Sequence, residues 1–195
     1  MVLLEPLLPS IATIQTELLQ APGLRYLIGG SCGLLLQQVD IGRSPRDLDI
    51  YVDVDDVTPV YSTLRQYAVD SPVYSETPIY ASILSHYQID GTAVEVVGDF
   101  KVQAMECSYQ VEVAYLWETH SQSALIDNQN IRIMPLAHEL LFNLLRDRPD
   151  RYEAIVRTMM LNPEPHRRVL ADIMQRNHWG SAFRQKVEAL LPKGK

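Results

Sequence analysis

The sequence predicts an α+β fold whose strands lie in the first two thirds of the chain and whose last third is helical. Residues 26–53 have the pattern of strand, glycine turn, helix, loop and strand, and residues 79–97 have that of a hairpin. From Pro135 onward, leucines recur at helical spacing. We therefore expect a catalytic domain over residues 1–135 and a C-terminal helical subdomain over residues 136–195 packed on it.

Residues 26–53 carry the clearest local pattern. A short apolar run ends at Gly29 and Gly30, and Ser31 follows as the expected N-cap of a helix over residues 32–38. Residues 47–53 alternate like a half-buried strand. This alternation places Asp47 and Asp49 together on one strand face, with Leu48, Ile50 and Val52 on the other.

The pair Asp47 and Asp49 predicts a cation site. Two carboxylates at positions i and i+2 of one strand face repel each other, and a divalent cation removes the conflict. Mg²⁺ is usually held by one or two carboxylates together with substrate phosphates. Backbone N–H groups at the glycine turn could bind such a phosphate. The alternatives are that the glycines form only a turn and the aspartates only a solvated strand face.

The other elements are predicted from hydrophobic periodicity and from residues that favour turns and helix ends. We expect Ser10 to cap a helix over residues 11–21, and Asp55 and Asp56 to cap one over 57–69. Asp90 and Gly91 predict the turn between strands 79–89 and 92–97. Further strands are expected at 111–117 and 131–134, joined through a turn at 127–130. Helices are expected near 136–147, 149–161, 164–177 and 180–191.

Composition narrows the class of protein. The chain has 195 residues, 47% of them hydrophobic, and a net charge of −7, so we expect one globular core and no general binding of DNA. Two cysteines fit a reducing, cytoplasmic setting. Apolar runs are too short to span a membrane, and the N-terminus lacks the basic region of a signal peptide.

Three motifs together resemble the nucleotidyltransferase superfamily that includes DNA polymerase beta. They are Gly29-Gly30-Ser31, then Gly42-Arg43, then Asp47-Leu48-Asp49-Ile50. Within the superfamily, the chain is most similar to small bacterial AbiEii-type proteins and to the aminoglycoside and lincosamide nucleotidyltransferases. The resemblance implies a nucleotidyltransferase-type mixed sheet flanked by helices. It also implies a third carboxylate on a later strand.

Glu95 is the expected third carboxylate, because Val94-Glu95-Val96 has the form that the family shows there; Asp90 and Asp99 are the nearest alternatives. The resemblance makes Asp47, Asp49 and Glu95 the catalytic and metal-binding residues, holding two Mg²⁺ ions. It makes Gly29, Gly30, Ser31, Arg43 and Arg46 the nucleotide-binding residues.

The implied activity is transfer of a nucleoside monophosphate from a nucleoside triphosphate, such as ATP, to a hydroxyl group of a small molecule, a protein or RNA. Three departures leave alternatives open. Sixteen residues separate Gly30 from Asp47, a longer gap than usual; Asn143 stands about where relatives carry a lysine; and residues 148–150 read Arg-Pro-Asp. The chain could instead be a degenerate member that binds a nucleotide or a partner, or a toxin–antitoxin or defence component.

Several other residues have structural interpretations. Cys32 is expected to be a small buried thiol, although it follows the glycine turn. The five histidines show no metal-ligand spacing. Arg148 and Arg151 are expected on solvated helix faces, with nucleotide or RNA contact as the alternative.

Overall fold

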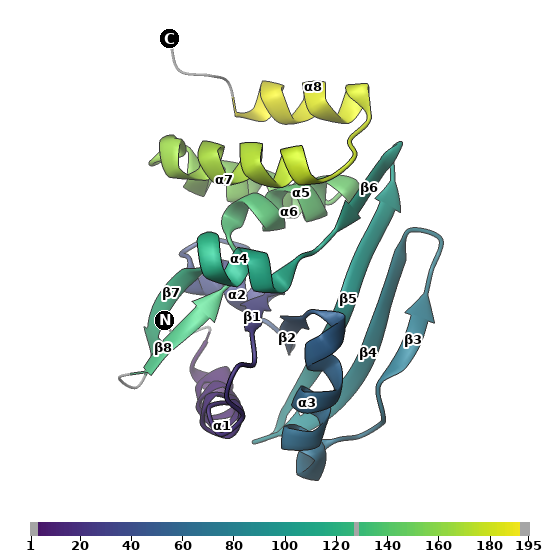
Figure 1. The fold of residues 1–195 in the computed structure, drawn as a ribbon. Helices are drawn as coiled ribbons and strands as arrows, with labels where there is room; N and C mark the ends of the chain where they lie inside the picture. Colours follow the sequence, from purple (N-terminus) through teal and green to yellow (C-terminus); the bar gives the residue numbers. More distant parts are fainter. Residues whose placement is uncertain (1–3, 127–128, 192–195) are drawn as a thin grey trace.

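The computed structural model describes residues 4–126 and 129–191 and contains a mixed sheet of eight strands (Figure 1). The strand order is β3-β4-β5-β2-β1-β8-β7, and β6 pairs with β5. Central β2 is antiparallel to β1 and parallel to β5. The strands are β1 (Tyr26–Gly29), β2 (Asp47–Val52), β3 (Val73–Glu76), β4 (Tyr80–Ile89), β5 (Thr92–Ala104), β6 (Cys107–Gln110), β7 (Gln122–Ile126) and β8 (Gln129–Ile133).

Helices flank this sheet, as predicted. They are α1 (Leu8–Leu18), α2 (Gly30–Leu36), α3 (Val54–Leu64), α4 (Val113–Thr119), α5 (Leu136–Leu145), α6 (Pro149–Met159), α7 (Pro163–Arg176) and α8 (Ser181–Leu190), with short 3-10 turns at Glu5–Leu7 and Arg65–Tyr67. Helices α5–α8 gather at one end of the molecule, away from α1 and α3 (Figure 1). No helix in the described part of the chain has the length and apolar character needed to cross a membrane.

The alternation of β2 divides its side chains between two apolar cores. Leu48, Ile50 and Val52 are buried with apolar residues of α1 and α3. Tyr51 instead belongs to the core that includes β5 and α5–α8. Asp47 and Asp49 share the face of Tyr51, so the fold directs them toward α5. The helices after Pro135 thus share a core with the sheet, while the domain boundary at residue 135 stays a prediction.

The predicted strand at 111–117 is wrong, because this segment contains α4. Asp53 explains the difference. Its carboxylate accepts hydrogen bonds from the backbone N–H groups of Val113 and Ala114, both at 2.7 Å, and so satisfies the start of α4. Alternating apolar residues favour a strand locally, but a contact 60 residues away in the sequence selects the helix.

Other local predictions also need correction. Ser10 lies within α1, where its hydroxyl donates to the carbonyl of Ile89 at 2.8 Å instead of capping the helix. Asp53, and not Asp55 or Asp56, occupies the N-cap position of α3. Strands β3, β6 and β7 were not predicted, and β5 continues beyond the predicted 92–97. Residues 127 and 128 of the predicted turn lie outside the described residues.

Candidate active site

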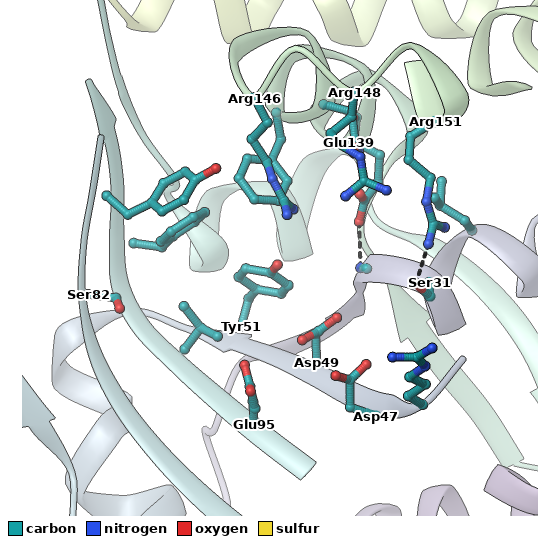
Figure 2. Close-up of a pocket in the computed structure, with 18 of the residues that line it drawn as sticks. Ser31, Asp47, Asp49, Tyr51, Ser82, Glu95, Glu139, Arg146, Arg148 and Arg151 are labelled. Atoms are coloured by element: carbon teal, nitrogen blue, oxygen red, sulfur yellow. Dashed lines mark hydrogen bonds between the residues drawn. The ribbon is translucent and has the colours of Figure 1, made fainter. Parts of the chain in front are cut away.

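A polar cavity of about 450 Å³ lies where β2 and β5 face α5 and α6 (Figure 2). Most of the residues predicted for the site line it: Gly30, Ser31, Arg43, Arg46, Asp47, Asp49 and Glu95. Gly29 ends β1 just behind the cavity, packed against the ring of Tyr51. The fold therefore brings residues of the three predicted motifs, together with the more distant Glu95, around one space.

The three predicted carboxylates lie on one side of this cavity. Asp47 and Asp49 share a face of β2, and Glu95 is the register partner of Asp49 on parallel β5. Burial, followed by the charges of Asp47 and Glu95, raises the pKa of Asp49 to about 7. The carboxylates of Asp47 and Glu95 therefore repel that of Asp49, and the folded protein keeps all three together despite this repulsion.

The two alternatives to Glu95 lie elsewhere. Asp90 is at the hairpin turn, where it accepts a hydrogen bond from the hydroxyl of Thr13 at 2.6 Å. Asp99 pairs with the ammonium group of Lys101 at 2.8 Å. Of these three acidic residues, Glu95 lines the cavity.

The donor set fits Mg²⁺ shared with a bound phosphate. Within residues 4–126 and 129–191, no three His, Cys, Asp or Glu side chains are close enough together to hold a metal ion by themselves. Carboxylate oxygens are hard ligands, however, and Mg²⁺ sites commonly combine one or two of them with substrate phosphates. The raised pKa of Asp49 shows a carboxylate that an adjacent cation would stabilise.

The glycine turn is built around Asp49. Gly30 has φ +58°, and a Cβ atom there would lie 1.8 Å from Oδ2 of Asp49. Only glycine combines this backbone conformation with such a close approach. Ser31 does not cap α2 as predicted, because Gly29 occupies the N-cap position; the Ser31 hydroxyl instead accepts a hydrogen bond from Nη2 of Arg151 at 3.0 Å.

Arginines form the opposite side of the cavity. Arg146, Arg148 and Arg151 point from the α5–α6 region toward the carboxylates (Figure 2), and Arg43 and Arg46 line the cavity from the loop before β2. The expectation that Arg151 is solvated is wrong, since it is only 5% exposed. Its Nη1 is buried without a hydrogen-bond partner among the described residues. This guanidinium nitrogen can donate a hydrogen bond to a water molecule or an anion in the cavity.

Glu139 of α5 is a site residue that sequence reasoning missed. It is 1% exposed, and its Oε1 accepts a hydrogen bond from the backbone N–H of Gly30 at 2.8 Å. Oε2 is buried with no partner in the described part of the chain. Burial, with a smaller contribution from the charge of Asp49, raises the pKa of Glu139 to about 8. An acid within a helix rich in leucine was the available signal.

The remaining wall of the cavity is partly aromatic, and the guanidinium group of Arg146 lies over the rings of Phe142 and Tyr80. Tyr80, Phe100 and Phe142 form a ring cluster, with centroid distances of 5.3–6.0 Å. Ser75, Thr77 and Ser82 also line the cavity. Such a wall suits a flat ring that carries polar groups.

Several solved structures align with this chain. TM1012 of Thermotoga maritima, a candidate nucleotidyltransferase, aligns over 78% of this chain and 92% of its own, with a TM-score of 0.61 and 18% identity. ANT(2″)-Ia, solved in complex with adenylyl-2″-tobramycin, aligns over 86% and 98%, with a TM-score of 0.46 and 12% identity. The lincosamide antibiotic adenylyltransferase LnuA, solved with lincomycin, aligns over 75% and 94%, with a TM-score of 0.45 and 13% identity.

The comparisons establish the fold of this chain. The likeness to TM1012 shows a nucleotidyltransferase fold, whereas the other two TM-scores are too low to carry an argument. Neither protein-family profiles nor curated protein sequences give a match. The closer relation to AbiEii-type proteins stays a prediction.

Proposed function

We propose that this protein is a nucleotidyltransferase that transfers a nucleoside monophosphate from a nucleoside triphosphate to a hydroxyl acceptor. One observation carries the proposal: a row of carboxylates faces a row of arginines across a single cavity on a nucleotidyltransferase fold. Carboxylates suit metal ions and arginines suit phosphates, so the two rows together suit a metal–triphosphate complex.

Each row has a chemical role in this proposal. Asp47, Asp49 and Glu95 would hold two Mg²⁺ ions, which when bound supply charge neutralisation at the reacting phosphate. Arg146 and Arg151 would bind and orient the β- and γ-phosphates, with the unpartnered Nη1 of Arg151 donating to one of them. Arg43 and Arg46 would neutralise charge at the cavity entrance.

The acceptor hydroxyl would approach from the Glu95 side. In the sheet, β5 lies between β2 and β4, so Glu95 lies on the β4 side of the aspartate pair. The acceptor oxygen would form a bond to the α-phosphorus while the bond to the pyrophosphate oxygen breaks. Glu95 would take the proton of the hydroxyl group. Positioning and charge would provide most of the rate enhancement.

A degenerate, nucleotide-binding protein is the second candidate. Asn143 stands where a lysine is expected, and its side-chain amide donates to the carbonyl of Glu139 at 2.8 Å instead of facing a phosphate. Glu139 also accepts the hydrogen bond of the Gly30 backbone N–H, which is then not available to a phosphate. Because of both features, two groups that would bind phosphate in the family pattern do not do so here. The three carboxylates, in contrast, favour activity. A defence role and a cytoplasmic location stay predictions.

Calorimetric titration tests the proposal. Wild-type protein is titrated with ATP, GTP, CTP and UTP, with and without Mg²⁺, and Asp49→Ala is compared with Asp99→Ala, an acid of β5 outside the cavity. We expect Mg²⁺-dependent binding of at least one nucleotide that Asp49→Ala loses and Asp99→Ala retains. Pyrophosphate release in the presence of cell extract then reports turnover. Binding without release supports the degenerate candidate, and no binding in any sample rejects both.

A further inference from the structure

Glu139 and Arg151 hold the Gly30–Ser31 turn from the side of the C-terminal helices. Oε1 of Glu139 accepts the Gly30 N–H at 2.8 Å, and Nη2 of Arg151 donates to the Ser31 hydroxyl at 3.0 Å. Both side chains are at least nine-tenths buried and line the cavity (Figure 2). Each also keeps a second polar atom, Oε2 or Nη1, without a partner among the described residues.

The same turn lies directly against Asp49. The carboxylate of Asp49 lies so close to Gly30 that a Cβ atom there would be 1.8 Å from its Oδ2. Any rotation of the Gly30 peptide therefore changes the space in which this carboxylate lies. On the basis of the proposed function, we infer that Glu139 is a positioning residue, which fixes Asp49 for metal and nucleotide binding by holding the backbone N–H of Gly30.

Hydrogen-bond acceptance, and not charge, is the property that this role requires. A glutamine at position 139 can still accept from the Gly30 N–H through its Oε1. A methionine has similar length but leaves that buried N–H without a strong acceptor. Glu139→Met is expected to fold, because an apolar side chain replaces a buried acid that forms no ion pair within the described residues. Glu153→Met, at an exposed glutamate of α6, controls for a glutamate-to-methionine replacement away from the turn.

Two measurements test this inference. Calorimetry with Mg²⁺-ATP should give an affinity about tenfold weaker in Glu139→Met, because a buried donor is left unsatisfied. Glu139→Gln and Glu153→Met should stay within about threefold of wild type. Amide hydrogen exchange of the ligand-free proteins should show Gly30 exchanging about tenfold faster in Glu139→Met only.

The outcomes separate this inference from the proposed function. Unchanged exchange of Gly30 in Glu139→Met overturns the inference whether or not nucleotide binds. Equal loss of affinity in Glu139→Gln and Glu139→Met also overturns it, because the charge would then be the property that matters. Absence of Mg²⁺-dependent binding in wild type rejects the proposed function, while the exchange of Gly30 still decides whether Glu139 holds the turn.

Discussion

Replacing Gly30 with alanine should disturb both the fold and the site, and the structure gives the size of each effect. Gly30 has φ +58°, where a non-glycine residue costs about 1–2 kcal/mol. The added Cβ would lie 1.8 Å from Oδ2 of Asp49, and contacts below 3.0 Å essentially never occur, so the carboxylate must retreat by at least 3.0 − 1.8 = 1.2 Å. Forcing a side chain off its rotamer adds about 0.5–1.5 kcal/mol.

Gly42 provides a matched control. It has φ +67°, and a Cβ atom there would have no neighbour within 4 Å. Gly42→Ala should therefore lose only the backbone contribution of about 1–2 kcal/mol, whereas Gly30→Ala should lose about 1.5–3.5 kcal/mol. Urea denaturation followed by circular dichroism at neutral pH measures both losses.

A double-mutant cycle with Asp49→Ala isolates the steric contribution. In the Asp49→Ala background the carboxylate is gone, so Gly30→Ala should cost no more free energy of unfolding than Gly42→Ala. Gly30→Ala alone should also lose nucleotide binding, because its Asp49 carboxylate is displaced. Equal losses for the two glycine variants, or an unchanged loss in the Asp49→Ala background, would refute this reasoning.

Two further predictions follow from the site and from α4. The fold raises the pKa of Asp49 from 3.8 to about 7, so the folded state binds a proton at Asp49 more tightly than the unfolded state does. The wild-type protein therefore loses stability as the pH rises from about 4 to about 7. The difference in free energy of unfolding between Asp49→Asn and wild type should grow in favour of the variant by about 2–4 kcal/mol as the pH rises from about 4 to about 8. Urea denaturation at several pH values measures this difference, and a difference that stays constant across the range would contradict the prediction. Asp53→Ala should lose about 1–2 kcal/mol by removing the acceptor for the Val113 and Ala114 N–H groups, whereas exposed Asp55→Ala should lose far less. Similar losses for the two variants would argue against capping by Asp53.

Local patterns predicted the segment from β1 to β2 because the information lies within it. The alternation of residues 47–53 assigns Leu48 and Ile50 to one face and Asp49 to the other, and the structure confirms this division. The segment between Gly30 and Asp47 is longer than usual, but its two arginines, Arg43 and Arg46, both line the cavity. Where a strand is half buried, its period is enough to orient its side chains.

Long-range contacts decided the elements that were predicted wrongly. Residues 111–117 alternate like a strand, yet the Asp53 carboxylate satisfies the first N–H groups of a helix there. Serine is a residue type that favours the N-cap position, but the hydroxyl group of Ser31 instead accepts a hydrogen bond from Arg151, far along the chain. Neither contact leaves a signal in the neighbouring sequence, so reasoning over short windows could not find them.

Glu95 and Glu139 are both acids with apolar neighbours, but only Glu95 stands in a motif that has the family's form. Glu95 was noticed as an acid among apolar residues of a strand, and the structure places it on the cavity beside Asp49. Glu139 is an acid beside buried apolar residues of α5, which include Leu136, Leu140 and Leu141, and it was not singled out from the sequence. Burying a carboxylate without an ion pair is costly, so its presence at such a position indicates a required contact. Here that contact is the N–H of Gly30, which joins the C-terminal helices to the carboxylates of the sheet.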